Sequence, residues 1–360
     1  LGGMTATAFA REIVHRCPFV DAVVAGEAEE PLKMLADGVP HSAIPNLVYR
    51  RRGGVVMNPV SYAATREELD AVDFARFDLL RDADLYDARW ALDHGEISAR
   101  PNAERLYYMC GGRGCTVSCS FCGGSRKAHL ELSGRRATIF RSPERLLDDA
   151  VKAGSAGCNT LYLCFDPPGT DPDHYPRFFE LAGRSGLDMA LIFECYRLPG
   201  ERFLDSFARA FDRGRSQIAL SPDSASDETR RRHKGYWYSN RALERTLARC
   251  SCRGVRTTLY YTLFPEDGWP AVRRLRKAQD RLKEKYGCRT LTLPIEVEPA
   301  SRWQLHPRRW GLGEGPFDFG YFFSRHQRIA TPPGDPGAAA GAEAPEQMEQ
   351  LEFLNAGAGS

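Results

Sequence analysis

Three cysteines in one short stretch are the residues of this sequence best suited to chemistry. Cys115, Cys119 and Cys122 lie in GGRGCTVSCSFCGGS, a C-x3-C-x2-C arrangement with the aromatic Phe121 before the last cysteine. The glycines on both sides allow the backbone to fold tightly around a bulky group and to direct amides at its sulfurs. Three thiolates around an iron-sulfur cluster leave one iron open to a further ligand.

Two other uses of these cysteines remain open from the residues alone. A structural zinc site needs a fourth ligand, for which Cys110 or His129 is available. Buried thiols without a ligand are the second alternative. The sequence has 11 cysteines, an odd number, and its N-terminus lacks the basic and then apolar layout of a signal peptide. We therefore expect a cytoplasmic protein whose thiols are metal ligands, catalytic groups or buried side chains.

The cysteine stretch follows the first of six apolar, β-branched or aromatic runs that predict strands. These runs are Leu106–Cys110, Thr160–Phe165, Met189–Cys195, Gln217–Leu220, Arg256–Leu263 and Thr290–Val297. Amphipathic stretches between them predict helices near 142–153, 174–185, 201–212, 239–251 and 268–286. Alternating strands and helices imply parallel strands. We therefore expect an α/β fold, a partial (βα)6 TIM-like barrel with its chemistry at the C-terminal ends of the strands.

The cysteine spacing, Phe121 and the six-unit βα array together resemble the radical S-adenosylmethionine (SAM) superfamily. The resemblance implies that Cys115, Cys119 and Cys122 hold a 4Fe-4S cluster whose open iron chelates SAM. It also implies that the reduced cluster cleaves SAM to methionine and a 5′-deoxyadenosyl radical, which abstracts a hydrogen from the substrate. The partners implied are a small-molecule substrate and a reductant such as flavodoxin or ferredoxin.

The same resemblance assigns further residues to SAM binding. The turn Phe165-Asp166-Pro167 departs from the glycine-glycine-acid turn that many members use for the SAM amino group. A structural role for Asp166, as a helix cap or a turn acid, is therefore the alternative. The turn from Ser221 to Ser224 resembles the polar turn that binds the ribose hydroxyls. The residues assigned to SAM are Phe121, Gly123, Gly124, Asp166, Glu194, Ser221 and Asp223.

Arginines and histidines near these motifs have both a site and a surface interpretation. Arg135, Arg136 and Arg141 suit the SAM carboxylate because a guanidinium pairs with it bidentately, and solvated surface positions are the alternative. His306 and His326 are either substrate contacts or ordinary surface histidines.

The N-terminal stretch resembles the last third of the cobalamin-binding domain that precedes the radical SAM barrel in a large subfamily. The points of match are Gly2-Gly3, a helix over 8–16, the apolar run Val20–Val24, and Gly26-Glu27 before a second helix over 29–35. A generic Rossmann-like unit is the alternative. We expect an N-terminally truncated protein that binds cobalamin poorly, because the first strands of such a domain are missing. Gly2 and Gly3 are its candidate cobalamin contacts.

The sequence divides into five expected parts. They are a Rossmann-like cobalamin-binding remnant at 1–50, a linker at 51–100, the radical SAM barrel at 101–300, an extension over the barrel at 301–330, and a low-complexity, disordered tail at 331–360. The net charge of +2 favours neither nucleic acid nor a membrane as a partner. No run approaches the ~18 apolar residues of a membrane span.

The subfamily resemblance implies cobalamin-dependent methylation of an unreactive carbon or phosphorus in a small-molecule or natural-product substrate. The alternatives within the superfamily are a cyclase or oxidoreductase, and a methylthiotransferase-like enzyme acting on tRNA. The tRNA alternative is disfavoured because a basic RNA-binding module is lacking at the C-terminus. A zinc-binding interaction module is the alternative from another class of protein.

Overall fold

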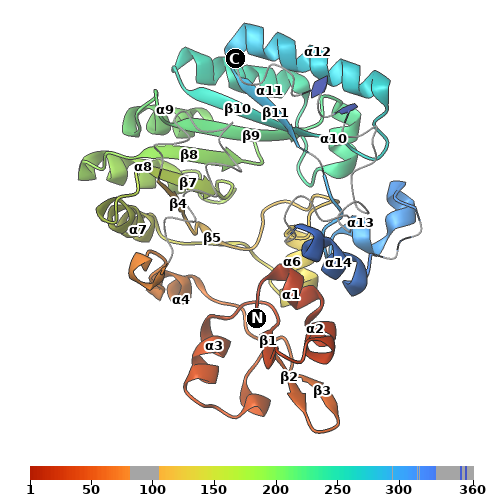
Figure 1. Cartoon of the computed structure of the whole chain (residues 1–360). Coiled ribbons are helices and arrows are strands. Elements are labelled where there is room, and N and C mark those ends of the chain that lie inside the picture. The colour runs from red at the N-terminus through yellow and green to blue at the C-terminus, as the bar shows by residue number, and fades with distance from the viewer. Residues whose placement is uncertain are drawn as a thin grey trace.

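Six parallel strands form the main sheet of the protein (Figure 1). The computed structural model describes residues 1–81, 105–293, 295–313, 315, 317–329, 349–350 and 353–354. Across the sheet the order is β11-β10-β9-β8-β7-β4, and each neighbouring pair is parallel. The strands are β4 (Leu106–Tyr108), β7 (Thr160–Cys164), β8 (Ala190–Cys195), β9 (Gln217–Asp223), β10 (Arg256–Thr262) and β11 (Arg289–Leu293). The expected α/β fold and all six strands are confirmed.

Helices connect successive strands, as the alternating pattern predicts. They are α7 (Pro143–Ser155), α8 (His174–Ser185), α9 (Glu201–Ala210), α11 (Asn240–Cys252) and α12 (Trp269–Tyr286). Pro143 occupies the first turn of α7, where its missing amide hydrogen costs nothing. Two further helices between the strands, α6 (Arg126–Ser133) and α10 (Asp227–His233), were not expected from the sequence. The cap of α10 is Ser226, whose hydroxyl accepts a hydrogen bond from the Thr229 amide at 3.2 Å.

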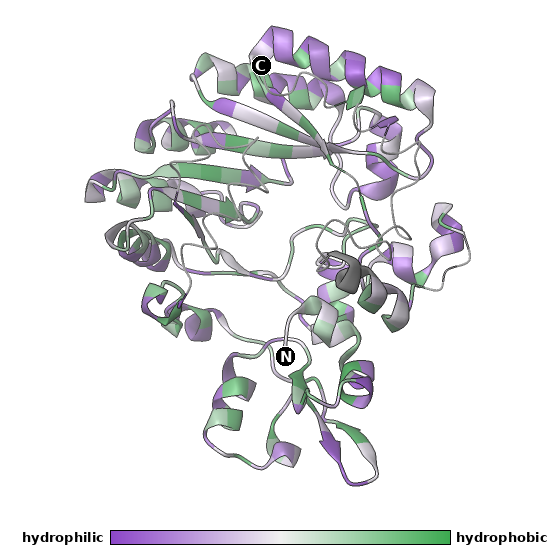
Figure 2. Cartoon of the chain, viewed as in Figure 1, coloured by the Kyte–Doolittle hydropathy of each residue, from purple (hydrophilic) through white to green (hydrophobic). Residues whose placement is uncertain are grey.

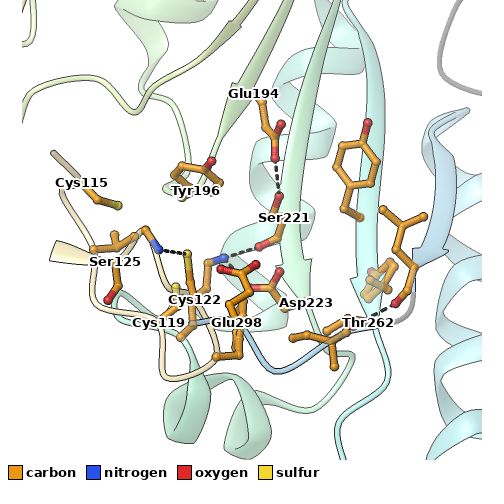
Figure 3. A pocket seen from close by; sticks show the side chains of 18 of the residues that line it. Cys115, Cys119, Cys122, Ser125, Glu194, Tyr196, Ser221, Asp223, Thr262 and Glu298 are labelled. Carbon is orange, nitrogen blue, oxygen red and sulfur yellow. Dashed lines mark hydrogen bonds and ion pairs between the residues drawn. The ribbon is translucent and has the colours of Figure 1, made fainter. Parts of the chain in front are cut away.

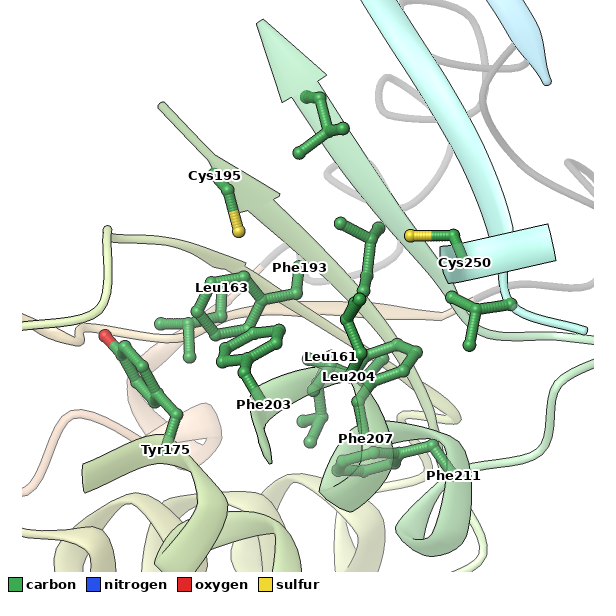
Figure 4. Close-up of a cluster of buried hydrophobic side chains, with 14 of the residues drawn as sticks. Leu161, Leu163, Tyr175, Phe193, Cys195, Phe203, Leu204, Phe207, Phe211 and Cys250 are labelled. Atoms are coloured by element: carbon green, nitrogen blue, oxygen red, sulfur yellow. The ribbon is translucent and has the colours of Figure 1, made fainter. Parts of the chain in front are cut away.

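The helix-covered face of the sheet is packed with aromatic rings (Figure 4). Phe193 on β8 has its ring centroid 4.8 Å from that of Tyr175 on α8 and 4.9 Å from that of Phe203 on α9. All three side chains are buried. Figure 2 shows the hydrophobic residues along the strands and hydrophilic residues along much of α12, as expected for a sheet covered by amphipathic helices.

A smaller unit precedes the main sheet. Its strands form an antiparallel sheet in the order β1-β2-β3, so the hairpin of β2 and β3 crosses the boundary expected at residue 50. A turn at Arg52-Gly53 joins β2 and β3. The elements are α1 (Met4–Ala8), α2 (Ala10–Arg16), β1 (Ala22–Val24), α3 (Glu29–Ala36), η1 (His41–Ala43), β2 (Leu47–Arg51), β3 (Gly54–Met57), α4 (Arg66–Ala71) and η2 (Phe77–Leu79).

The chain after β11 returns toward this smaller unit through α13 (Arg302–Leu305), η3 (Pro307–Trp310) and α14 (Phe319–Ile329). Phe322 of α14 is buried, with its ring 5.5 Å from that of Phe9 in the N-terminal unit. The expected disordered tail at 331–360 lies outside the described residues, apart from 349–350 and 353–354. Among the described residues, every helix is too short or too polar to cross a membrane.

Candidate functional site

The three motif cysteines lie in the loop between β5 (Gly112–Arg113) and α6 (Arg126–Ser133). The loop closes on itself through a hydrogen bond from the Arg126 amide to the Val117 carbonyl at 2.8 Å. Ser125 caps the helix by accepting a hydrogen bond from the Ala128 amide at 3.3 Å. The end of the loop is thereby fixed by the start of α6.

A second segment, residues 233–235, packs tightly over the cysteine loop. The Ser120 amide donates to the His233 carbonyl at 2.8 Å, and the Gly235 amide donates to Cys119 Sγ at 3.4 Å. A Cβ at Gly235 would lie 1.9 Å from the backbone nitrogen of Ser118, so only glycine fits there. Sequence reasoning missed this segment, whose one visible signal is the run His-Lys-Gly at the end of α10.

Burial keeps the three thiols protonated at neutral pH in the free protein. It raises the pKa of Cys119 to about 11, although the nearby Lys234 ammonium acts to lower it. Burial also raises the pKa values of Cys115 and Cys122. In the described part of the chain, no three Cys, His, Asp or Glu side chains are arranged so that they could hold a metal ion together.

The donor set nevertheless fits a three-thiolate cluster. All three cysteines belong to one loop and line one cavity, and backbone amides are directed at two of the sulfurs. The Gly235 amide donates to Cys119 Sγ, and the Gly124 amide donates to Cys122 Sγ at 3.3 Å. Cluster binding requires loss of the thiol protons and reorientation of side chains within this loop.

The cavity has a volume of about 580 Å³ and opens at the C-terminal ends of β7 to β11 (Figure 3). It brings together most of the residues assigned from the sequence, which come from the cysteine loop and from the ends of β8 and β9. These are Cys115, Cys119, Phe121, Cys122, Gly124, Glu194, Ser221 and Asp223. The apolar side chains of Leu291, Leu293 and Ile295 line it as well.

Glu194 is the centre of a hydrogen-bonded group on the cavity wall. Tyr162 donates its hydroxyl to one carboxylate oxygen at 2.5 Å, and Ser221 donates to the other at 3.2 Å. Both hydroxyl oxygens keep lone pairs that can accept hydrogen bonds from a ligand. The group therefore joins the ends of β7, β8 and β9 and presents acceptors to the cavity.

Asp223 forms an ion pair with Lys234, a residue that sequence reasoning did not identify. The Lys234 ammonium lies 2.5 Å from Asp223 Oδ2 and donates to the Ser221 carbonyl at 2.6 Å. Burial acts to lower the pKa of Lys234, but Asp223, Tyr238 and Cys119 together outweigh it, and the net pKa is raised. Asp223 has a φ of 61°, a left-handed conformation that aspartate tolerates better than most residues.

Asp166 lies beside the main cavity and not in its wall. Its carboxylate accepts hydrogen bonds from the Tyr196 amide at 2.6 Å, the Arg197 amide at 3.0 Å and the Thr116 hydroxyl at 3.1 Å. It lines a smaller hollow of about 110 Å³ with Cys115. These bonds tie the ends of β7 and β8 to the cysteine loop, which is the behaviour that the turn-acid alternative predicts.

Residues 298–303 close the loop from the C-terminal side. The Gly123 amide donates to Glu298 Oε2 at 2.7 Å, and a Cβ at Gly123 would lie 2.1 Å from the Pro299 carbonyl oxygen. Phe121 packs edge-on against Trp303, with ring centroids 5.9 Å apart. Gly123 therefore serves close packing within the protein, whereas Phe121 also reaches the cavity.

Several residues singled out from the sequence lie elsewhere. Gly2 and Gly3 are exposed, with open space around them, and do not line the cysteine cavity. The arginine interpretations were wrong for two of the three residues. Arg135 is buried against Glu27, and Arg141 is buried against Asp149 and stacks over Phe74, so both are internal ion pairs and not solvated side chains. Arg136 is exposed.

Cys110, His129 and His306 are also outside the cavity. Cys110 accepts a hydrogen bond from Arg113 Nη1 at 3.3 Å, and neither it nor His129 lines the cavity. His306 is exposed and lines a hollow on the outer surface with Arg308 and Arg309. His326 falls in α14, where its side chain lies outside the described residues.

Comparison with known proteins bears on the part of the chain that contains the cysteine loop. Residues 109–278 match the family model of the radical SAM superfamily. The anaerobic magnesium-protoporphyrin IX monomethyl ester cyclase of Cereibacter sphaeroides is 30% identical over 182 residues. These residues are 50% of this chain and 27% of the cyclase, so the chain spans about a quarter of that relative's length.

Two solved structures of the radical SAM methyltransferase TsrM from Kitasatospora setae share the fold. The one with tryptophan substrate and the SAM analogue aza-SAM has a TM-score of 0.62 at 16% identity, covering 84% of this chain and 56% of that chain. The one with cobalamin and a [4Fe-4S] cluster has a TM-score of 0.61 at 15% identity, covering 98% of this chain and 66% of that chain. At these identities the likeness shows the fold alone.

Proposed function

We propose that this protein is a radical SAM enzyme whose site is the cavity beside Cys115, Cys119 and Cys122. One observation carries the proposal. The three cysteines of the loop share a cavity of about 580 Å³ with polar side chains from three strand ends, within the matched radical SAM domain. The C-terminal edge of a parallel sheet is the usual place for such a site. We place the reaction in the cytoplasm.

The three cysteines would hold a 4Fe-4S cluster. Bound there with SAM, the cluster would supply the electron and the hydrogen-abstracting 5′-deoxyadenosyl radical. The Gly124 and Gly235 amides stabilise negative charge on the sulfurs of Cys122 and Cys119 by hydrogen bonding. The cavity also provides a wall of apolar side chains that limits access of water to a reactive species.

The polar wall would orient SAM. Asp223 can accept hydrogen bonds from the vicinal ribose hydroxyls, and its pairing with Lys234 fixes the carboxylate in place. Glu194, held by Tyr162 and Ser221, offers acceptors to an amino or hydroxyl group. Phe121 presents an aromatic ring for the adenine. A small molecule is the substrate class that suits an enclosed cavity of this size.

The finer proposal is methyl transfer with the help of cobalamin. It is supported by the likeness in fold to a methyltransferase whose structure contains both cobalamin and a [4Fe-4S] cluster. Gly2 and Gly3 are too exposed to form a corrin site by themselves. We therefore derive no step through cobalamin from the residues present. Equilibrium dialysis of the 360-residue chain against cobalamin is expected to show weak binding, and stoichiometric tight binding would contradict this assignment of the N-terminal residues.

A radical SAM cyclase is the second candidate. It is favoured by the 30% identity to the cyclase of Cereibacter sphaeroides over half of this chain. Cyclisation and methylation share the first hydrogen abstraction and differ in the fate of the substrate radical. Mass spectrometry of the product distinguishes a gain of one methyl group from a loss of hydrogen.

The test of the shared proposal is SAM cleavage. Anaerobically reconstituted, reduced protein is expected to convert SAM to 5′-deoxyadenosine, slowly when substrate is absent. Cys119→Ala is expected to abolish this activity. The matched control is Cys250→Ala, since Cys250 is also a buried thiol but lies in the apolar core on α11. Equal loss in both variants, or no cleavage by the unaltered protein, would contradict the proposal.

A further inference from the structure

Arginines from three separate elements surround Trp310, on the outer side of the cysteine loop. The guanidinium carbons of Arg302, Arg232 and Arg309 lie 5.5, 5.7 and 5.9 Å from the centre of the Trp310 ring. These residues come from α13, α10 and η3, which the fold brings together. Trp310 itself is only 5% exposed, so the outer surface at this place consists mainly of the arginines. We call these four residues the basic face.

The basic face has little internal charge compensation. Arg232 has a carboxylate neighbour, Glu266, at 3.6 Å. Arg302 and Arg309 have no carboxylate partner in the described part of the chain, and the Nε of Arg302 is buried without a hydrogen-bond acceptor. The exposed guanidinium of Arg309 therefore carries a charge that is not neutralised within the described residues and that an acidic partner can pair with.

An apolar anchor lies next to the arginines. Leu305 is 49% exposed and lines a hollow of about 490 Å³ together with His306, Pro307, Arg308 and Arg309. An exposed leucine within a basic rim is the usual composition of a protein docking surface with a complementary acidic partner. A small anion would be bound by the arginines alone, so the exposed Leu305 favours a protein as the partner.

Aromatic side chains in mutual contact lie between the basic face and the cysteine loop. Trp310 lies 5.1 Å from the His233 ring, and His233 stacks on Phe264 at 4.3 Å. Phe264 in turn lies 5.8 Å from Phe121, which directly precedes Cys122 and lines the cavity from its other side. A partner on the basic face would therefore approach the cysteines from behind the loop and leave the cavity free.

We propose that the basic face docks a small acidic electron-transfer protein, such as a flavodoxin, which delivers electrons to the group held by the cysteines. This rests on the proposed function, because it assumes a redox centre at Cys115, Cys119 and Cys122. In each transfer the carrier loses one electron and the centre gains one, and no heavy-atom bond is formed or broken at this surface. Opposite charges steer such partners together and make their association sensitive to salt.

The test measures binding directly. The reconstituted 360-residue protein is titrated with flavodoxin by calorimetry at low and at physiological ionic strength. The double variant Arg302→Glu and Arg309→Glu is expected to weaken binding about tenfold or more at low salt and to flatten the salt dependence. Arg309→Glu alone, at an exposed position, is expected to give a smaller loss in the same direction and guards against misfolding of the double variant.

The matched control is Arg273→Glu with Arg274→Glu. These two exposed arginines lie on α12 and are not part of the basic face, and the change in net charge is identical. Unchanged binding in the control together with loss in the first variant supports the proposal. Equal effects in both variants, no binding by the unaltered protein, or tighter binding of a single-stranded RNA than of flavodoxin would overturn it.

A second readout separates this inference from the proposed function. SAM cleavage is measured with flavodoxin and with dithionite, a small reductant that needs no docking surface. The Arg302→Glu and Arg309→Glu variant is expected to lose flavodoxin-dependent cleavage and to keep dithionite-dependent cleavage. Absence of cleavage with either reductant in the unaltered protein overturns the proposed function, whereas the calorimetric comparison still decides the docking.

Discussion

The two faces of the six-stranded sheet are built from alternate residues of the same strands and have opposite properties. On β7 and β8, Leu161, Leu163 and Phe193 face the helices and belong to the apolar core (Figure 4). Their neighbours Tyr162 and Glu194 face the cavity and hydrogen-bond to each other. The apolar side chains of the core face pack against the helices, whereas the polar side chains of the cavity face can still form hydrogen bonds with a ligand.

This difference shows how one strand supplies stability and function at once. Side chains along a strand alternate between the two faces, so a substitution at one position affects mainly one of them. Changes on the core face should alter the free energy of unfolding with little direct effect on ligand affinity. Changes on the cavity face should alter ligand affinity with little effect on the free energy of unfolding.

The largest expected effect on stability is at Phe193. Phe193→Ala is expected to lower the free energy of unfolding by about 3 to 5 kcal/mol, because the ring is fully buried among Tyr175, Phe179 and Phe203. Phe193→Leu should cost much less, since it keeps most of the apolar volume. Denaturant unfolding measures both. A loss below about 1 kcal/mol for the alanine variant would contradict the claim that the core face supplies stability.

His174 makes the free energy of unfolding depend on pH. His174 is the first residue of α8 and is buried. Burial lowers its pKa to about 4, from 6.5 in the unfolded chain. Because the folded pKa is depressed, the contribution of this residue is fully present above pH 6.5 and is lost as the pH falls toward 4. The expected loss between pH 7 and pH 4.5 is about 2 kcal/mol.

His174→Phe serves as the control for this pH dependence. The variant has no titrating group at this position, so its unfolding free energy should fall less steeply over the same pH range. Denaturant melts at several pH values measure the difference. Parallel pH profiles for the two proteins would show that His174 is not buried as the neutral form.

The smallest expected effect is at Asp223 on the cavity side. Asp223→Asn keeps an acceptor for Lys234 but removes the charge, and the dissociation constant for SAM is expected to rise about tenfold. The iron content after reconstitution should not change, because Asp223 belongs to β9 and not to the cysteine loop. Calorimetry with SAM and an iron assay check this. Unchanged SAM affinity would remove the ribose assignment.

The sequence was informative where its signals are local. The periodicity of the six strands and five connecting helices predicted the sheet, because apolar alternation reports directly on burial. The cysteine spacing predicted the loop, and the positions of Glu194, Ser221 and Asp223 at strand ends predicted that they would meet, since parallel strands end at one edge.

The contacts that were not predicted join residues far apart in the chain. Lys234 pairs with Asp223 and Gly235 reaches Cys119 because α10 turns the chain back over the loop. Glu27 accepts a hydrogen bond from Arg135, which is 108 residues away, at 2.6 Å. No local pattern marks these residues as partners, because each bond depends on how separate elements pack. The surface interpretation was therefore wrong for Arg135 and Arg141, whereas Arg136 is exposed.

Iron and sulfide analysis of the anaerobically reconstituted protein tests the central claim most directly. The unaltered protein and Cys250→Ala are expected to contain about four iron and four sulfide per chain, the content of one 4Fe-4S cluster. Cys115→Ala, Cys119→Ala and Cys122→Ala should each bind little of either. Stoichiometric zinc without iron in the unaltered protein, or full iron content in all three loop variants, would contradict the assignment of the cavity to radical SAM chemistry.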